Sequence, residues 1–347
     1  MTIEKPRISI LMPSYNEENG MRAALDSLTD PFVLKNAEII IIDGMSTDRT
    51  RGVIREFADE NRGLPVRTLD NRQRLQSYGL NIGLAEAAGE IIVRADAHCL
   101  YPPKYVKRCV ALLESKSVAN AGGVQLPAGT ETVQSAIAAA MRHPVGSGEA
   151  KFRTRNYAGY AEGAFVGTFR KKLFDEIGTY DSGAHPNEDG ELNLRILKSG
   201  RKIYVDGSIE VTYFPRRMLG ALARQYFYYG RGRAYTTWKH KKLTGLRQIA
   251  PPVLVASLAG SLLAGVVWPF ALLLPAAYAG SLFGVSLLAK LPDFCYRTGK
   301  PEAFKIRLLM PAAWAAMHLS WGAGFLVRFI RLLTVRRDDW AKNSTLS

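Results

Sequence analysis

The sequence contains few cysteines and no paired cysteine motif. Cys99, Cys109 and Cys295 are the three thiols in 347 residues. Their number and scatter exclude a disulfide framework, and the lack of a paired motif gives no support for a structural zinc site. The N-terminus lacks the long apolar stretch of a secretory signal, because Glu4 and Lys5 are followed at once by a short strand-like run. We therefore expect a reducing compartment, with the N-terminal part of the chain in the cytoplasm.

Acidic residues are absent from one long segment. The whole chain has 46 Lys and Arg against 31 Asp and Glu, a formal charge of +15. No acidic residue occurs from Val211 to Ala289, where basic residues crowd the approach to an apolar run. These are Arg216, Arg217, Arg224, Arg231, Arg233, Lys239, Lys241, Lys242 and Arg247. This placement favours the cytoplasmic surface of a membrane. None of the usual nucleic-acid-binding modules occurs, so we expect no nucleic-acid partner.

Charge of either sign is missing from Pro251 to Ala289, a run of 39 residues. One membrane crossing needs about 20 apolar residues. The run therefore predicts two crossings, with a turn near Pro269 or Pro275. An apolar hairpin in the core of a soluble domain is the alternative.

A further run, Leu308 to Val327, is also long enough to cross a membrane. It contains Trp314, His318 and Trp321, which suit an interfacial or re-entrant helix as well. Basic residues flank the first apolar run and follow the last one, which slightly favours an even number of crossings. The sequence is compatible with either two or three membrane crossings.

The N-terminal part alternates short apolar runs with longer amphipathic ones, a rhythm typical of βαβ units and a mostly parallel sheet. Strands are expected at Ile8 to Met12, Glu38 to Ile42, Val66 to Leu69 and Glu90 to Ala95, with helices near 17–28, 47–61, 73–88 and 103–115. From about 126 to 214 the pattern loosens into Gly-rich loops with helices near 170–177 and 188–199. Ligands of such a sheet bind at the carboxyl ends of its strands.

Two polar motifs follow the first two expected strands. The first runs Met12-Pro13-Ser14-Tyr15-Asn16-Glu17-Glu18, where a stacking aromatic and acceptor side chains can hold a flat base. The second runs from Ile41 to Thr50 and contains Asp43, whose carboxylate can accept a hydrogen bond from a base N–H. The first motif also fits an ordinary strand-to-helix turn with an acidic first helical turn, and the second fits a turn in which Ser46 or Thr47 would cap the next helix.

A third motif, Arg94-Ala95-Asp96-Ala97-His98, directly follows an apolar strand. In extended backbone, Asp96 and His98 point to the same face. A carboxylate and an imidazole are suitable ligands of a divalent first-row metal and favour Mn²⁺ more than an all-carboxylate site would. A loop with incidental polar residues is the alternative.

Two further motifs lie later in the chain. Asn187-Glu188-Asp189-Gly190-Glu191 opens a helix, and one of its carboxylates can take a proton from an attacking hydroxyl; acidic residues are also common at helix starts for their own sake. In Gln225 to Arg233 (QYFYYGRGR), Arg231 and Arg233 can grip a pyrophosphate. A membrane-facing basic patch explains the second motif equally well.

In order and spacing, these five motifs resemble the family-2 glycosyltransferases of GT-A fold over residues 7 to 235. The resemblance implies an α/β, Rossmann-like fold with a mostly parallel sheet, followed by a membrane-embedded helical region. It also implies roles for individual residues: Pro13, Tyr15, Glu17 and Asp43 for base and ribose, Asp96 and His98 for Mn²⁺ or Mg²⁺, and Asp189 as catalytic base, with Glu188 as its competitor. Arg74, Arg231 and Arg233 would assist on the nucleotide side, where Asp96 also belongs, and Glu162 with Gly163 are weaker acceptor-side candidates.

The sequence departs from the family pattern at two points. His98 replaces the second carboxylate of the usual D-x-D motif, and QYFYYGRGR is not the Q-x-x-R-W of processive synthases, which favours transfer of a single sugar. The basic segment and C-terminal apolar run look most like the ExoA-type enzymes of bacterial succinoglycan and related exopolysaccharide assembly. That likeness implies inverting transfer of a hexose such as glucose from a UDP-sugar to a polyprenyl-diphosphate-linked saccharide at the bacterial inner membrane, with the catalytic domain facing the cytoplasm.

Two alternatives remain for the activity. One is transfer straight onto polyprenyl phosphate, and the other is a non-catalytic membrane scaffold that keeps the nucleotide-sugar-binding fold. For the organisation of the chain we expect a glycosyltransferase domain at 1–214, a basic juxtamembrane segment at 215–250, membrane helices at 251–334 and a polar tail at 335–347.

Overall fold

The computed structural model describes residues 6–148, 150–242, 248–296 and 299–334. They divide into a first unit, made of 1–126 and 150–213, and a second unit, made of 127–149 and 214–347. Residues 127–149, which fall inside the glycosyltransferase domain expected from the sequence, thus group with the C-terminal part of the chain. The expected polar tail at 335–347 lies outside the described residues.

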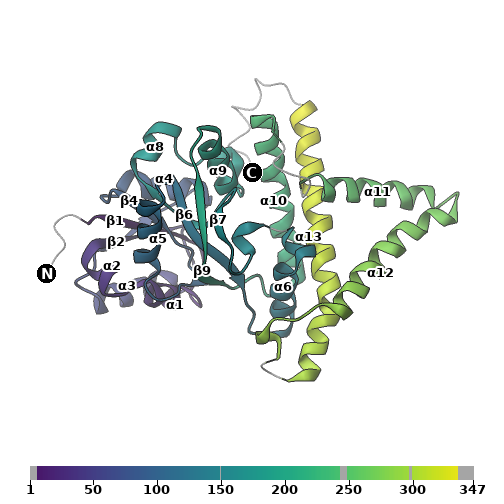
Figure 1. The fold of residues 1–347 in the computed structure, drawn as a ribbon, viewed down its shortest axis with the longest axis horizontal. Helices are drawn as coiled ribbons and strands as arrows, with labels where there is room; N and C mark the ends of the chain where they lie inside the picture. The colour runs from purple at the N-terminus through teal and green to yellow at the C-terminus, as the bar shows by residue number, and fades with distance from the viewer. Residues whose placement is uncertain (1–5, 149, 243–247, 297–298, 335–347) are drawn as a thin grey trace. The chain divides into compact units, whose positions relative to one another are not determined.

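The first unit is an α/β structure whose elements alternate as expected in its first half (Figure 1). The elements up to β6 are β1 (Ile8–Ser14), α1 (Met21–Leu28), α2 (Pro31–Asn36), β2 (Ala37–Asp43), α3 (Thr50–Glu60), β3 (Val66–Asp70), α4 (Gln76–Glu86), β4 (Ile91–Arg94), β5 (Cys99–Leu100), α5 (Tyr105–Ser115) and β6 (Asn120–Pro127). After residue 150 come η1 (Lys151–Arg153), β7 (Ala158–Tyr160), β8 (Phe165–Arg170), α8 (Lys172–Ile177), η2 (Ser182–Ala184), α9 (Glu188–Lys198) and β9 (Ile203–Tyr213). The four expected strands and six expected helices are confirmed, with ends that differ by a few residues.

The strands of this unit form one sheet in the order β3-β2-β1-β4-β8-β6-β9-β5, with β7 paired to β9. β3, β2, β1 and β4 are parallel, and β8 joins β4 in the antiparallel sense. All seven residues of β2 are buried, which explains why its sequence AEIIIID is a nearly continuous apolar run. The parallel half therefore has its carboxyl ends at one edge, where ligands of such sheets bind.

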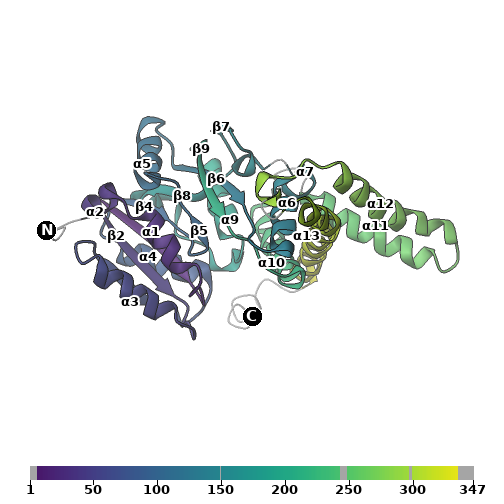
Figure 2. The same cartoon turned by 90° about the horizontal axis from the view of Figure 1, so that it is seen from below.

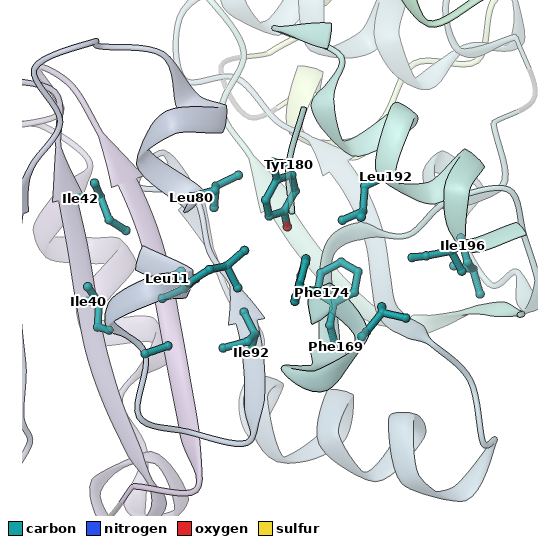
Figure 3. Packing of buried hydrophobic residues seen from close by; sticks show 14 residues of the cluster. Leu11, Ile40, Ile42, Leu80, Ile92, Phe169, Phe174, Tyr180, Leu192 and Ile196 are labelled. Carbon is teal, nitrogen blue, oxygen red and sulfur yellow. The ribbon is translucent and has the colours of Figure 1, made fainter. Parts of the chain in front are cut away.

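A hydrophobic core joins the parallel strands to the later helices (Figure 3). Its buried members come from β1, β2, α4, β4, β8, α8, α9 and β9, and from the segments just after α4 and α8. They include Leu11, Ile40, Ile42, Leu80, Ile92, Phe169, Phe174, Tyr180, Leu192 and Ile196. Because α9 packs into the same core as β1 and β2, the acidic start of α9 is held in a fixed position relative to the strand ends.

The second unit is helical. Its elements are α6 (Thr132–Arg142), α7 (Pro144–Ser147), α10 (Leu219–His240), α11 (Ala250–Ala264), η4 (Pro269–Leu272), α12 (Leu273–Leu288), η5 (Asp293–Tyr296) and α13 (Lys300–Thr334). The long helix α13 packs along α10 and also contacts α6, α11 and α12. In two views, α11 and α12 form a hairpin whose tip lies away from α13 (Figures 1 and 2).

Close packing makes α13 a core helix of this unit. Trp314 is fully buried, and its Nε1 donates a hydrogen bond to the carbonyl of Ala140 in α6 at 3.0 Å. A Cβ on Gly230 of α10 would lie 2.0 Å from the Trp321 carbonyl, so only glycine lets the two helices approach this closely. One face of the run Leu308 to Val327 is therefore buried in this packing, while Leu308, Leu319 and Val327 are exposed. Within the described ranges, one helical stretch is long and apolar enough to cross a membrane, Pro269–Leu288.

Candidate active site

Three strands end side by side at the carboxyl edge of the parallel sheet. The register places Ser14 of β1 opposite Asp43 of β2, and Asp43 opposite Asp70 of β3. Arg51 of α3 links the two carboxylates: its Nε donates to Asp43 at 2.6 Å and its Nη2 to Asp70 at 2.5 Å. Neither Arg51 nor Asp70 was predicted from the sequence to be part of this site. The position of Asp70 at the end of a parallel strand was the signal that would have found it.

Asp43 organises the loop that follows β2. It is fully buried, and besides Arg51 it accepts hydrogen bonds from the Ser46 backbone N–H at 3.0 Å and the Ser46 hydroxyl at 2.5 Å. The alternative in which Ser46 or Thr47 caps the next helix is wrong, because α3 begins after Arg49 without a side-chain cap. Contact between Asp43 and a base stays a prediction, since its oxygens already serve the loop.

The loops after β1 and β2 are hydrogen-bonded to each other. The backbone N–H of Asn16 donates to the Ser46 hydroxyl at 2.9 Å, and the N–H of Thr47 donates to Asn16 Oδ1 at 2.9 Å. The N–H of Glu17 donates to the Thr50 hydroxyl at 2.8 Å. The first two motifs of the sequence therefore form one continuous surface.

Tyr15 and Arg74, two of the residues expected to contact a nucleotide, lie together. The Arg74 guanidinium stands over the Tyr15 ring, 5.3 Å from its centroid, and the Tyr15 residue is 44% exposed. Left-handed backbone occurs at Asn16 (φ 52°), Met45 (φ 61°) and Arg74 (φ 57°), all in the loops at this edge. Such strain in residues other than glycine is typical of binding sites. Pro13 lies inside β1, next to this surface.

The third motif lies between β4 and β5 and is fixed by hydrogen bonds. The hydroxyl of Tyr101 accepts from the Asp96 N–H at 2.6 Å and donates to the Asp96 carbonyl at 3.1 Å. Burial raises the pKa of Tyr101 well above its ordinary value, so this hydroxyl keeps its proton. His98 Nδ1 lies 3.1 Å from Glu17 Oε1. Glu17, expected to contact the nucleotide, is thus the partner that orients His98.

Asp96 and His98 fit a divalent metal by their donor atoms. A carboxylate partner on Nδ1 turns the other ring nitrogen of His98 into the coordinating one, which is the usual arrangement at metal-binding histidines. Among the residues that the structure describes, no three His, Cys, Asp or Glu side chains group closely enough to hold a metal by themselves. The two protein ligands would therefore be completed by oxygen atoms of a bound ligand or of water.

A buried arginine joins the metal motif to the acidic motif. Arg94 Nη2 donates to Asp96 Oδ1 at 3.1 Å, and Nη1 donates to Asp189 Oδ2 at the start of α9. With its amide oriented to satisfy both neighbours, Gln76 accepts from Arg94 at 2.5 Å and donates to Glu188 at 3.1 Å. Burial lowers the pKa of Arg94, but Asp189 and Asp96 raise it further, so the guanidinium stays charged.

The two carboxylates of the acidic motif differ in access to solvent. The Asp189 side chain is 45% exposed, whereas Glu188 is buried. Desolvation raises the pKa of Asp189 to about 6, and the neighbouring Arg94 opposes this rise. Part of the Asp189 side chain is in water, whereas its carboxylate lies against the buried Arg94 guanidinium. Asp189 is accessible to a substrate and Glu188 is not.

The other expected residues lie elsewhere. Glu162 and Gly163 are in the loop between β7 and β8, where a Cβ on Gly163 would lie 2.9 Å from Nδ2 of Asn193. Their contact with an acceptor stays a prediction. Arg231 and Arg233 are in helix α10 of the second unit, and Arg231 stands over the Tyr228 ring. Their contact with a pyrophosphate also stays a prediction.

The chain is similar to known proteins over most of its length. It is 34% identical over 321 residues to the "Succinoglycan biosynthesis protein ExoA" of Rhizobium meliloti strain 1021, covering 91% of this chain and 93% of that protein. It is 26% identical over 230 residues to the Methanococcus voltae "Dolichyl N-acetyl-alpha-D-glucosaminyl phosphate 3-beta-D-2,3-diacetamido-2,3-dideoxy-beta-D-glucuronosyltransferase", covering 64% and 71%.

The fold is also found among solved structures. The mannosyltransferase PcManGT of Pyrobaculum calidifontis, solved with GDP-Man and Mn²⁺, has a TM-score of 0.57 and 18% identity, covering 93% of this chain and 87% of that one. This likeness supports a GT-A fold. The sequence model of Glycosyl transferase family 2 matches residues 9–178, which contain the first three motifs and the sheet edge described above. Together with the identity to the Rhizobium protein, this match means that the chain belongs to glycosyl transferase family 2.

Proposed function

We propose that the protein moves a single hexose, such as glucose, from a UDP-sugar to a hydroxyl of a polyprenyl-diphosphate-linked saccharide, with inversion at the anomeric carbon. The observation that supports this most is the Arg94 bridge between Asp96 and Asp189. It joins a residue suited to the diphosphate side of a donor to a residue suited to an acceptor hydroxyl, within one site.

The donor would bind at the carboxyl edge of the sheet. The surface made by the first two loops carries the exposed Tyr15 ring under the Arg74 guanidinium, which suits stacking and a nearby anionic group. Asp43 stabilises the loop that forms this surface through its hydrogen bonds with Ser46 and Arg51. The base would therefore be recognised by a preformed loop, while discrimination among hexoses would depend on other contacts.

Asp96 and His98 would hold Mn²⁺ or Mg²⁺. When bound, such a metal would stabilise the negative charge of the departing nucleoside diphosphate. Glu17 would orient the His98 ring, and Tyr101 would fix the backbone of Asp96. Arg94 adds a permanent positive charge beside the same carboxylate.

Asp189 would act as the base. Its carboxylate would accept the proton of the attacking acceptor hydroxyl, whose oxygen forms the new bond to the anomeric carbon as the bond to the diphosphate breaks. Arg94 would aim the Asp189 carboxylate by holding one of its oxygens. Glu188, buried and bonded to Gln76, would support the start of α9.

A lipid-linked acceptor fits two observations. The second unit carries the uncharged run Pro251–Ala289, next to a basic stretch without acidic residues. The name of the Methanococcus voltae relative describes a transferase acting on a dolichyl-linked sugar. We therefore propose attachment to the cytoplasmic face of the bacterial inner membrane, where such an acceptor would be in reach.

The test supplies membranes containing the protein with radiolabelled UDP-sugars and one of two acceptors. We expect label in a polyprenyl-diphosphate-linked saccharide, in a reaction stopped by EDTA and by Asp189→Asn. Label on polyprenyl phosphate alone would assign the protein to the alternative acceptor. Absence of turnover with a panel of sugar nucleotides, in a protein that still binds them, would favour the non-catalytic scaffold.

A further inference from the structure

The hairpin of α11 and α12 is capped by an apolar turn. Four large side chains of this turn are exposed: Val266, Val267, Trp268 and Phe270, with Val267 at 86% and Trp268 at 60%. No charged residue occurs between Pro251 and Ala289. In Figures 1 and 2 this turn is at the end of the hairpin remote from α13. A surface of this size and composition is unfavourable in water and favourable in hydrocarbon.

The first arm of the hairpin is too short for a full crossing. α11 has 15 residues, which at about 1.5 Å per residue gives roughly 22 Å. The hydrocarbon core of a bilayer is about 30 Å thick. The second arm, Pro269–Leu288, has 20 residues and is just long enough. A hairpin crosses a bilayer only if both arms do, so the lengths favour a turn that stays inside the membrane.

The backbone of the turn is hydrogen-bonded within the hairpin itself. The N–H groups of Gly265, Val266, Val267, Trp268 and Ala271 donate to carbonyls of residues 261–268 over 2.8–3.3 Å. Pro269 has no N–H to satisfy. The hydroxyl of Ser261 donates to the Ala271 carbonyl across the turn. Hydrocarbon demands internal pairing of this kind, whereas a turn in water does not.

The base of the hairpin is polar and basic. Arg307 of α13 donates to the carbonyls of Leu287 and Ala289, at the end of α12, and Lys290 follows exposed. The acid-free basic stretch of α10 precedes the other arm. Positive charge at both ends of an apolar insertion complements anionic lipid head groups. Both ends of the hairpin therefore match the same membrane surface.

We propose that the α11–α12 hairpin is re-entrant: it enters one leaflet, turns inside the hydrocarbon near Val266 to Phe270, and leaves on the side where it entered. This inference rests on the membrane attachment given under the proposed function and replaces the two crossings expected from the sequence. The occupant of the apolar surface is the acyl-chain region of a single leaflet. The protein thereby reaches lipid-linked material without exposing any part of the hairpin on the far side.

Cysteine labelling in sealed membrane vesicles tests the topology. Val267→Cys probes the turn and Lys290→Cys probes the base, while the unsubstituted protein gives the background because Cys99, Cys109 and Cys295 are buried. With a membrane-impermeant maleimide, we expect Lys290→Cys to react from the cytoplasmic side. Val267→Cys should react from neither side until detergent is added. Labelling of Val267→Cys from the far side, or from the near side without detergent, would overturn the re-entrant arrangement.

Charge placement gives a second measurement that needs no enzymatic activity. Val267→Asp puts a charge at the turn, and Val253→Asp puts the same charge near the base of α11, where the native residue is 54% exposed. In flotation with phosphatidylethanolamine and phosphatidylglycerol vesicles, Val267→Asp should bind about 50-fold more weakly or worse, and Val253→Asp only a few-fold. Equal binding of the two variants would place the turn in water and refute the proposal.

The two measurements separate the inference from the function on which it rests. If the unsubstituted protein does not float with vesicles at all, membrane attachment itself fails, and with it the re-entrant hairpin. If it floats but Val267→Cys is labelled from the far side, attachment stands and only the re-entrant arrangement fails. Failure of sugar transfer leaves both readouts unchanged, because neither one depends on turnover.

Discussion

Arg94 and Asp189 form a hydrogen-bonded ion pair although 95 positions separate them in the sequence. Arg94 ends β4 and Asp189 lies in the first turn of α9, and both elements are fixed by the same hydrophobic core. The second terminal nitrogen of the guanidinium, Nη2, donates a hydrogen bond to Asp96 Oδ1. The pair therefore couples the position of the proposed base to that of the proposed metal ligand.

Replacing Arg94 should damage both activity and stability. Arg94→Lys keeps the charge but cannot reach both carboxylates with one ammonium group, so turnover should fall about 100-fold through misplacement of Asp189. Arg94→Met also removes the charge, and we expect a loss of about 2 kcal/mol in the free energy of unfolding. This is less than for a fully buried pair, because the Asp189 side chain is 45% exposed. Denaturant unfolding and kcat/KM measure the two effects, and unchanged turnover in Arg94→Met would contradict the role of the pair.

Asp189→Asn should lower turnover by about two to four orders of magnitude and leave the affinity for the nucleotide sugar nearly unchanged. Asparagine keeps the size and hydrogen bonding of the side chain but cannot take the proton. Glu188→Gln is the matched control, because Glu188 is adjacent but buried. It should retain turnover within about 10-fold of the unsubstituted protein. Loss of turnover in Glu188→Gln alone would move the base to that residue.

Turnover should fall as the pH drops through about 6. Desolvation raises the pKa of Asp189 to about 6, and the carboxylate is the active form of a base. Protonation below this pH removes the base, so the rate should decrease by about tenfold per pH unit well below 6 and be level above about 7. Arg94 opposes the rise in pKa, so Arg94→Met should move the acidic limb to higher pH. A limb that persists unchanged in Asp189→Asn would belong to another group.

The sequence predicted the parallel half of the fold because its signals are local. The run Glu38 to Ile42 is buried on both faces and has the continuous apolar pattern of a central strand. The antiparallel half was not assigned, although Ile203–Tyr213 alternates between buried and more exposed positions and so carried a strand signal. β6 was harder to find, because Gly122 and Gly123 interrupt its pattern where the strand approaches Phe165 and Ile209.

The site was predicted in part, for a physical reason of the same kind. Motifs at the ends of strands pointed to Asp43, Asp96 and His98. The side chains that hydrogen-bond to these residues come from other segments of the sequence. Arg51 and Gln76 lie in the first turns of helices whose sequences show only ordinary polar positions there. Composition alone could not show that α11 and α12 are largely exposed whereas α13 packs in the core of the second unit. All three helices have apolar sequences, and only their packing buries Trp314.

Metal removal should abolish transfer. Substitution of the two expected metal ligands, Asp96 and His98, should also affect activity more than substitution of Glu17. Asp96→Ala and His98→Ala should end activity or raise the Mn²⁺ concentration needed for half-maximal rate, because each loses one ligand. Glu17→Gln replaces the carboxylate partner of His98 Nδ1 by a neutral amide, so we expect an increase of about 10- to 100-fold in that concentration. Metal-dependent protection against thermal unfolding measures the affinity without turnover. Full activity in saturating EDTA would refute the metal assignment.

Removing the apolar hairpin should separate catalysis from access to the lipid-borne acceptor. Truncation after Arg247 would also delete α13, and its loss would expose the faces of α6 and α10 against which Trp314 and Trp321 pack. We therefore expect that truncated chain to aggregate.

Replacing residues 254–285 by a flexible Gly/Ser linker keeps α13 in place and is the sharper variant. It should fold, bind nucleotide sugar and use a water-soluble acceptor at the normal rate. Its activity on the native lipid-linked acceptor should fall by about 10²-fold or more, because the membrane no longer raises the effective concentration of that substrate. Thermal unfolding with and without nucleotide sugar checks that the linker variant is intact. Full activity of this variant on the lipid-linked acceptor would mean that the hairpin has no part in acceptor access.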